Sequence, residues 1–141
     1  NALAANDPDS TNFIYERIDK PEKNFYIIVN CRADRIDRSV QLGKLISTRI
    51  KADYYFVTGG ETRVLCRTAI KNGINRDKLI DLGNKDVESV YERIAELIND
   101  KGVILAIGNI VGYGERLIEQ FVQKGNPQHS AASPRGIAQQ L

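Results

Sequence analysis

The chain has 141 residues, of which 42% are hydrophobic and 27% are charged, which are ordinary values for one soluble globular domain. Its net charge of +2 is too small to predict binding to nucleic acid or to an anionic membrane surface. No apolar run approaches the roughly 18 residues that span a bilayer, so we expect a soluble protein.

Residue types that bind zinc or form disulfides are scarce in this sequence. The two cysteines, Cys31 and Cys66, lack C-x-x-C spacing, and His129 is the single histidine. We therefore predict no metal site, thiols that serve only in packing, and a reducing, cytoplasmic setting. The sequence contains no methionine and opens with NALAA, which is typical of the end of a strand. This opening predicts a fragment of a longer chain.

Hydrophobic periodicity predicts that strands and helices alternate along the chain. Continuous β-branched and aromatic runs indicate buried strands, and apolar side chains three or four residues apart indicate helices. In chain order, the expected elements are a strand at 1–5, a helix at about 12–18, a strand at 25–29, a helix at 36–50, a strand at 53–58, a helix at 61–72, a strand at 78–82, a helix capped by Asp86, a strand at 103–107 and a helix at about 112–123.

This alternation indicates right-handed crossovers and a mostly parallel sheet. We predict a doubly wound, three-layer, Rossmann-like α/β domain over residues 1–123, with about five or six strands. Residues 124–141 are rich in Gly, Pro, Ser, Gln and Ala and have little apolar periodicity. We predict that they form a loose C-terminal tail.

Polar or glycine-rich turns follow four of the predicted strands. In an open parallel sheet such turns lie together at the carboxyl edge, where ligands bind. The four turns are ANDPDST at 5–11, NCRADRIDR at 30–38, TGGET at 58–62 and GNIVG at 108–112. We predict that they form one rim.

Each turn has a structural and a functional interpretation. The first turn is also typical of helix capping, the arginines and aspartates of the second are also typical of solvated ion pairs, and the glycines also permit positive φ. The functional interpretation is anion recognition, because guanidinium groups and glycine-rich helix starts bind phosphate or carboxylate oxygens. Neither G-x-x-x-x-G-K-[ST] nor G-x-G-x-x-G occurs in the sequence.

The segments NALAANDPDST, IIVNCRADRIDRSVQLG, YYFVTGGET and ILAIGNIVGYGERLIEQF together carry a family resemblance. The chain resembles the C-terminal region of the ligase subunits of poly-γ-glutamate capsule synthases, within the Mur ligase family. The similarity covers about residues 1–123 and is most specific over 30–43. Three of the turns stand where many Mur ligases carry Asp-Asp-Tyr-Ala-His-Asn-Pro, Asp-Asn-Pro-Arg and Gly-Lys-Gly-His-Glu motifs. The histidine, arginine and lysine of those motifs are absent here.

The resemblance implies one domain of an ATP-dependent amide ligase that polymerises glutamate through γ-linkages via an acyl phosphate, in capsule biosynthesis. In such ligases a central domain binds most of the ATP and Mg²⁺, and the C-terminal domain closes over it. The fragment alone is then expected to be inactive. The implied partners are glutamate, the growing polymer, the rest of the polypeptide and membrane subunits of the synthase. The implied location is cytoplasmic and peripherally membrane-associated.

The resemblance also implies roles for the rim residues. The expected nucleotide or phosphate contacts are Asn6, Ser10, Thr11, Arg32, Asp34 and Arg35. The expected contacts with the incoming amino acid are Gly59, Gly60, Glu61, Gly108 and Asn109. Two other functions remain open at this point: a non-catalytic regulatory module that binds a nucleotide or anion, and a structural domain for assembly.

Overall fold

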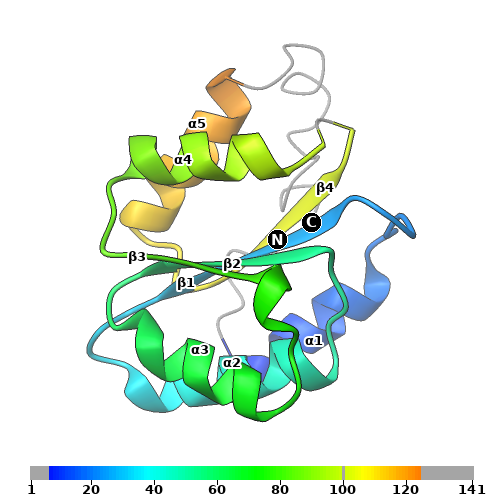
Figure 1. The fold of residues 1–141 in the computed structure, drawn as a ribbon, viewed down its shortest axis with the longest axis vertical. Helices are drawn as coiled ribbons and strands as arrows, with labels where there is room; N and C mark the ends of the chain where they lie inside the picture. Colours follow the sequence, from blue (N-terminus) through cyan, green and yellow to red (C-terminus); the bar gives the residue numbers. More distant parts are fainter. Residues whose placement is uncertain (1–6, 100, 125–141) are drawn as a thin grey trace.

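The computed structural model describes residues 7–99 and 101–124 (Figure 1). Within them, helices and strands alternate along the chain. In order, the elements are α1 (Pro8–Arg17), β1 (Phe25–Cys31), α2 (Ile36–Thr48), β2 (Tyr54–Gly59), α3 (Thr62–Lys71), the 3-10 helix η2 (Arg76–Lys78), β3 (Leu79–Gly83), α4 (Val87–Leu97), β4 (Val103–Gly108) and α5 (Tyr113–Lys124).

The expected count of five or six strands is wrong for the described residues, which form a sheet of four strands. The predicted and observed numbers of strands differ because the strand expected at 1–5 lies outside the described residues. Of the tail expected at 124–141, Lys124 is the last residue of α5, and 125–141 lie outside the described residues. The later strands and helices are confirmed, with ends that move by no more than two residues. Helix α1 begins earlier than expected, at Pro8.

The early start of α1 follows from its capping residues. Asp7 has extended backbone angles, and its carboxylate accepts a hydrogen bond from the Ser10 amide at 2.8 Å. Pro8, next in the chain, has no amide hydrogen to leave unpaired at a helix start. Asp86 caps α4 in the same way by accepting from the Ser89 amide at 3.0 Å, as predicted.

The sheet is parallel throughout and carries helices on both faces, which confirms the doubly wound α/β class. The strand order is β3-β2-β1-β4, and each neighbouring pair runs parallel. Figure 1 shows α1, α2 and α3 on one face and α4 and α5 on the other. The three layers are therefore those of a Rossmann-like domain.

This order creates a switch point between β1 and β4. The chain moves from β1 through β2 to β3 in one direction and then returns to β4 on the other side of β1. Helix α2 leaves β1 toward one face, and α5 leaves β4 toward the other (Figure 1). The two connections diverge beyond the carboxyl ends of these strands, which is where open α/β sheets bind ligands.

The core lies on both faces of β1, β2 and β4. Every residue of β1 is buried, and Ile27, Val29 and Phe56 are fully inaccessible to solvent. Burial on both faces explains why these strands are continuous apolar runs without alternation. Within residues 7–99 and 101–124, none of the helices has the length and apolar character needed to cross a bilayer.

Candidate functional site

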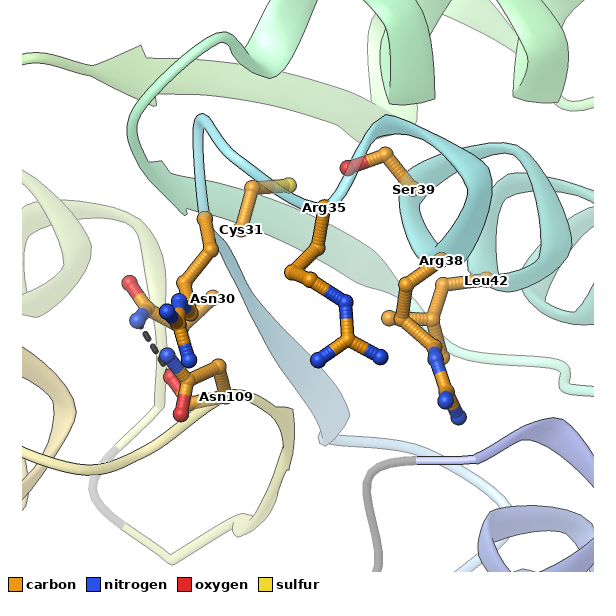
Figure 2. Close-up of a pocket in the computed structure, with 8 residues that line it drawn as sticks. Asn30, Cys31, Arg35, Arg38, Ser39, Leu42 and Asn109 are labelled. Carbon is orange, nitrogen blue, oxygen red and sulfur yellow. Dashed lines mark hydrogen bonds between the residues drawn. The ribbon is translucent and has the colours of Figure 1, made fainter.

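A small pocket opens at the switch point (Figure 2). Its volume is about 20 Å³. Its lining side chains carry positive charge and include no carboxylate: they are Asn30, Cys31, Arg32, Arg35, Arg38, Ser39, Leu42 and Asn109. The pocket therefore favours an anionic group.

The floor of the pocket is built around Asn30, which lies near the end of β1. Asn30 is only 4% exposed to solvent. Its side-chain oxygen accepts a hydrogen bond from the Thr58 hydroxyl at 2.7 Å. Its side-chain NH₂ donates to the carbonyl of Asn109, a contact drawn in Figure 2. The main chain adds a bond from the Asn109 amide to the Asn30 carbonyl at 3.0 Å. One side chain thus ties the ends of β2 and β4 to β1.

Two glycines let the neighbouring turns approach β1 closely. Gly59 ends β2 with φ of 94°, and Gly108 ends β4 with φ of 90°. A Cβ at Gly59 would lie 2.2 Å from the Cys31 carbonyl oxygen, and one at Gly108 would lie 2.5 Å from that of Asn30. The structural interpretation of these glycines, positive φ in a tight turn, is therefore confirmed.

The three pocket arginines differ in their surroundings. Arg32 binds Asp34 through two parallel bonds, Nε to Oδ1 at 2.8 Å and an Nη to Oδ2 at 2.7 Å. The Arg32 side chain is 48% exposed and that of Asp34 63%, so this pair is a solvated ion pair. The bond from Arg32 is the main reason why the pKa of Asp34 is lowered.

Arg35 and Arg38 stand at the start of α2. Arg35 is its N-cap residue, and Arg38 follows one turn later. Figure 2 shows the Arg35 guanidinium between Asn109 and Arg38. Among the described residues, no hydrogen bond or ion pair engages the Arg35 side chain, so its donors are available to a ligand.

The Cys31 thiol in the pocket wall is neutral at physiological pH. Burial raises its pKa to about 11, against a smaller opposite effect of a hydrogen bond with Ser39. Burial likewise raises the pKa of Cys66 to about 12. Neither thiol forms a reactive thiolate near neutral pH, which agrees with the packing role predicted for both.

The structure brings only some of the expected site residues together. Arg32, Arg35 and Asn109 line the same pocket. Ser10 is exposed beside Asp7, and Thr11 is fully buried. Neither of these two residues lines the pocket, and Asn6 lies outside the described residues.

The turn after β2 stands on the other side of β1 from β4. The Gly60 amide donates to the Cys31 carbonyl at 3.3 Å. Glu61 is exposed, adopts a left-handed φ of 52° and begins α3 without a side-chain cap. The residues of this turn, 59–61, do not line the pocket.

Several lining residues were absent from the predicted site. Arg38 could have been predicted from its spacing, since it follows Arg35 by three positions and helical spacing places both on one side of α2. Asn30 is a polar residue inside an apolar strand, which also could have indicated a buried polar network. Ser39 and Leu42 carried no signal that separates them from ordinary helix packing. In the part of the chain that the structure describes, no group of three His, Cys, Asp or Glu side chains could hold a metal ion.

Comparison with known proteins places the chain in a family. The model of the poly-gamma-glutamate synthase CapB C-terminal domain matches residues 1–124. PGA synthase CapB of Bacillus subtilis (strain 168) is 35% identical over 124 residues, covering 86% of this chain and 31% of that protein. Capsule biosynthesis protein CapB of Bacillus anthracis is 30% identical over 127 residues, covering 88% of this chain and 27% of that protein.

The chain thus spans less than a third of either relative, and no solved structure matches it. The family match covers the four turns of the rim, including every lining residue of the pocket. The resemblance predicted from the sequence is confirmed. The chain belongs to the family of poly-gamma-glutamate synthase CapB C-terminal domains.

Proposed function

We propose that this chain is the C-terminal domain of an ATP-dependent ligase that joins glutamate residues through γ-amide bonds. The observation that carries the proposal is an arginine-lined, carboxylate-free pocket at the switch point of a domain from the CapB family. The B. subtilis relative is named as a PGA synthase and the B. anthracis relative as a capsule biosynthesis protein. Both names fit a role in capsule synthesis.

The proposed reaction joins two anionic substrates. ATP with Mg²⁺ supplies the phosphoryl group that turns the γ-carboxylate of one glutamate unit into an acyl phosphate. The amine of the other glutamate attacks the acyl carbon, the bond to the phosphate oxygen breaks, and inorganic phosphate leaves with the amide formed. Such an intermediate hydrolyses in water, so the site needs positive charge, orientation and a cover that excludes solvent.

We assign this domain the role of that cover. The pocket accommodates the oxygen atoms of an anion but is far too small for a nucleoside, since about 20 Å³ holds about one or two water-sized groups. Most of the nucleotide and the metal would then be bound by the part of the enzyme that this chain does not include. Closure of the domain brings the rim to that site.

Within the rim, the proposed contacts fall on two sides. Arg32, Asp34 and Arg35, with Asn6 and Ser10, are proposed to face the nucleotide phosphates; Thr11, expected among these contacts from the sequence, is fully buried and is not proposed as one. The turns at Gly59–Glu61 and Gly108–Asn109 are proposed to face the incoming amino acid. Membrane subunits of the synthase are the proposed further partners, which would hold the enzyme at the cytoplasmic side of the membrane.

The proposal can be tested in the full-length enzyme with Arg35→Gln. Loss of a charge-assisted contact costs about 1.5–3 kcal/mol, so kcat/KM for γ-glutamyl ligation should fall about 10- to 100-fold. Arg93→Gln is the control, because Arg93 is also an exposed arginine but lies on α4, away from the pocket, where it pairs with Glu96. Both variants should unfold like the wild type. Equal turnover of the two variants would contradict the assignment.

A non-catalytic anion-binding module is the second candidate, favoured by the same pocket. The two candidate functions differ in the affinity for nucleotide that they predict for this chain alone. The module would bind ATP or ADP through these residues without the rest of the enzyme, whereas the ligase domain would bind nucleotide only weakly alone. Calorimetric titration of this chain with ADP separates the two.

A further inference from the structure

We propose that Tyr113 is a positioning residue, whose hydroxyl holds the turn after β4 in the place where it meets the incoming amino acid. Tyr113 is the first residue of α5, and this turn, residues 109–112, directly precedes it. The inference rests on the proposed function for the identity of the substrate, because Asn109 is proposed there as a contact with glutamate. The link that the hydroxyl makes can be measured without ligation.

The hydroxyl of Tyr113 reaches a different turn of the same edge. It donates a hydrogen bond to the main-chain carbonyl of Lys85 at 2.8 Å. Lys85 lies between the end of β3 and the start of α4, and Figure 1 shows this connection beside the start of α5. Burial raises the pKa of the Tyr113 phenol, so the hydroxyl keeps its proton and can donate at physiological pH. One bond therefore ties the turn after β4 to the turn after β3.

This bond completes a circuit of hydrogen bonds around the carboxyl edge of the sheet. The Asn84 amide donates to the carbonyl of Gly59 at 2.8 Å, which joins the turn after β3 to the end of β2. The Asn30 side chain joins β1 to β2 and also to Asn109. The turn after β4 is thus held to β1 at its first residue and, through Tyr113, to the turn after β3 at its other end.

Local bonds shape the turn after β4 but do not fix where it lies. The Glu115 amide donates to the Ile110 carbonyl at 2.7 Å, and the Gly112 amide donates to the Glu115 carboxylate at 3.0 Å. Both bonds join the turn to its own helix, so they would move with it. A Cβ added at Gly112 would meet nothing within 4 Å in the described part of the chain. The Tyr113 bond therefore sets the position of this end of the turn relative to β3.

The position of the turn matters because Asn109 lines the pocket, where Figure 2 shows it beside Arg35. A displacement of about 1 Å in a group that positions a substrate can cost about 100-fold in rate. The bonds to Asn30 keep one end of the turn in place when the Tyr113 bond is lost, so we expect a smaller effect. The KM for glutamate should rise about 3- to 10-fold. The KM for ATP should stay within about 2-fold, because other turns are proposed to face the nucleotide.

The experiment compares two Tyr→Phe variants of the full-length enzyme by steady-state kinetics. Tyr113→Phe removes the hydroxyl and keeps the ring, which lies 6.0 Å from the Arg116 guanidinium. Tyr55→Phe is the matched control, because the buried Tyr55 hydroxyl also donates to a carbonyl, that of Ile50 at 2.6 Å, but at the amino end of β2. A merely structural role would lower the folded fraction and so the apparent kcat, and would leave both KM values unchanged.

Hydrogen–deuterium exchange tests the link between the turns without ligation. Loss of the hydroxyl should speed amide exchange about 2- to 10-fold over residues 109–115 and 84–86 in Tyr113→Phe. Tyr55→Phe should speed exchange over residues 50–55 instead, where its hydroxyl is bonded. Exchange at the wild-type rate over both turns in Tyr113→Phe would overturn the proposal.

The kinetic results can also reject it. An unchanged KM for glutamate in Tyr113→Phe rejects the positioning role, and an equal rise in KM for ATP rejects its assignment to the amino-acid side. An equal rise in KM for glutamate in Tyr55→Phe would show that general loss of stability is the cause.

Failure of the positioning role and failure of the proposed function give different results. If the wild-type enzyme does not ligate glutamate but exchange quickens at both turns in Tyr113→Phe, the ligase assignment fails and the link between the turns stands. If ligation proceeds while neither KM nor exchange responds to Tyr113→Phe, the positioning role fails and the ligase assignment stands.

Discussion

The hydroxyl of Thr58 donates a hydrogen bond to Oδ1 of Asn30 at 2.7 Å, between two side chains that are both buried. The strand register places these residues directly opposite each other, with Gly108 opposite Asn30 on its other side. Asn30 therefore connects β1 to its two neighbours, β2 and β4, at the edge where the pocket opens. A polar contact of this kind fixes the positions of the two turns that form the rim.

Replacing Asn30 with Ala should destabilise the chain by about 2–4 kcal/mol, because it leaves the buried Thr58 hydroxyl and the Asn109 carbonyl without their partner. Urea unfolding measures the change. Asn72→Ala is the control, since that exposed amide bonds only to a carbonyl of its own helix, and its cost should stay below about 1 kcal/mol. A double-mutant cycle with Thr58→Val should show coupling of about 1 kcal/mol. Additive effects would show that the hydrogen bond contributes nothing.

Gly108→Ala should be far more damaging than Gly73→Ala, although both glycines have positive φ. At Gly73 an added Cβ meets nothing within 4 Å, so only the left-handed backbone costs energy, about 1–2 kcal/mol. At Gly108 it also meets the Asn30 carbonyl oxygen at 2.5 Å, which forces the two strands apart and adds about 1–3 kcal/mol. Thermal unfolding of the two variants separates the effects. Equal losses would mean that backbone conformation alone requires Gly108.

The sequence was a good guide to the fold because its elements have strong local signals. β1 and β4 are continuous apolar runs, and Asp86 caps α4 as predicted. The start of α1 was placed too late because Asp7 and Pro8 were assigned to a turn, although their pattern also suits a helix start. No local sequence pattern indicates the order of the strands. The sequence therefore predicted that the four turns lie at one edge of the sheet, but not which turns are neighbours.

The sequence predicted only part of the candidate site, because local patterns show which residues follow a buried strand but not which strands are neighbours. Arg32 and Arg35 were selected as residues that follow a buried strand, and both line the pocket. The position of β1 between β2 and β4 decides that Asn109 joins them while Glu61 does not. The pairing of Arg32 with Asp34 depends on the path of the loop, so the sequence left the ion-pair and the anion-binding interpretations open for both arginines.

The buried thiol of Cys31 should make stability depend on alkaline pH. Its pKa rises from 9.0 to about 11 on folding. Between these values the unfolded chain has lost a proton that the folded chain retains, so the free energy of unfolding falls as pH rises. Cys31→Ala lacks this contribution, and the stability difference between wild type and variant should shrink from pH 9 to pH 11. Urea unfolding at several pH values measures this difference in the free energy of unfolding. Because both proteins carry the same tyrosines and lysines, most of the contribution of those groups cancels in the difference. A constant difference would show that Cys31 titrates normally when folded.

Val111→Asp should impair ligation without unfolding the domain. Val111 is 77% exposed in the turn after β4, and Ile36 is 41% exposed next to Arg35. Both follow the carboxyl ends of the strands that flank the pocket, and the chain spans less than a third of its relatives. Under the proposed closure of the domain, we therefore expect these apolar side chains to contact the rest of the enzyme.

A carboxylate at position 111 would have to be desolvated in the closed state, so kcat/KM of the full-length enzyme should fall about 10-fold or more. The free energy of unfolding should change by less than about 0.5 kcal/mol, as for most surface substitutions. Ala95→Asp adds the same charge to an exposed position on α4 and serves as the control. If both variants ligate at the wild-type rate, the turn after β4 is not part of the closed interface. Loss of activity in both would instead point to the added charge and not to the position.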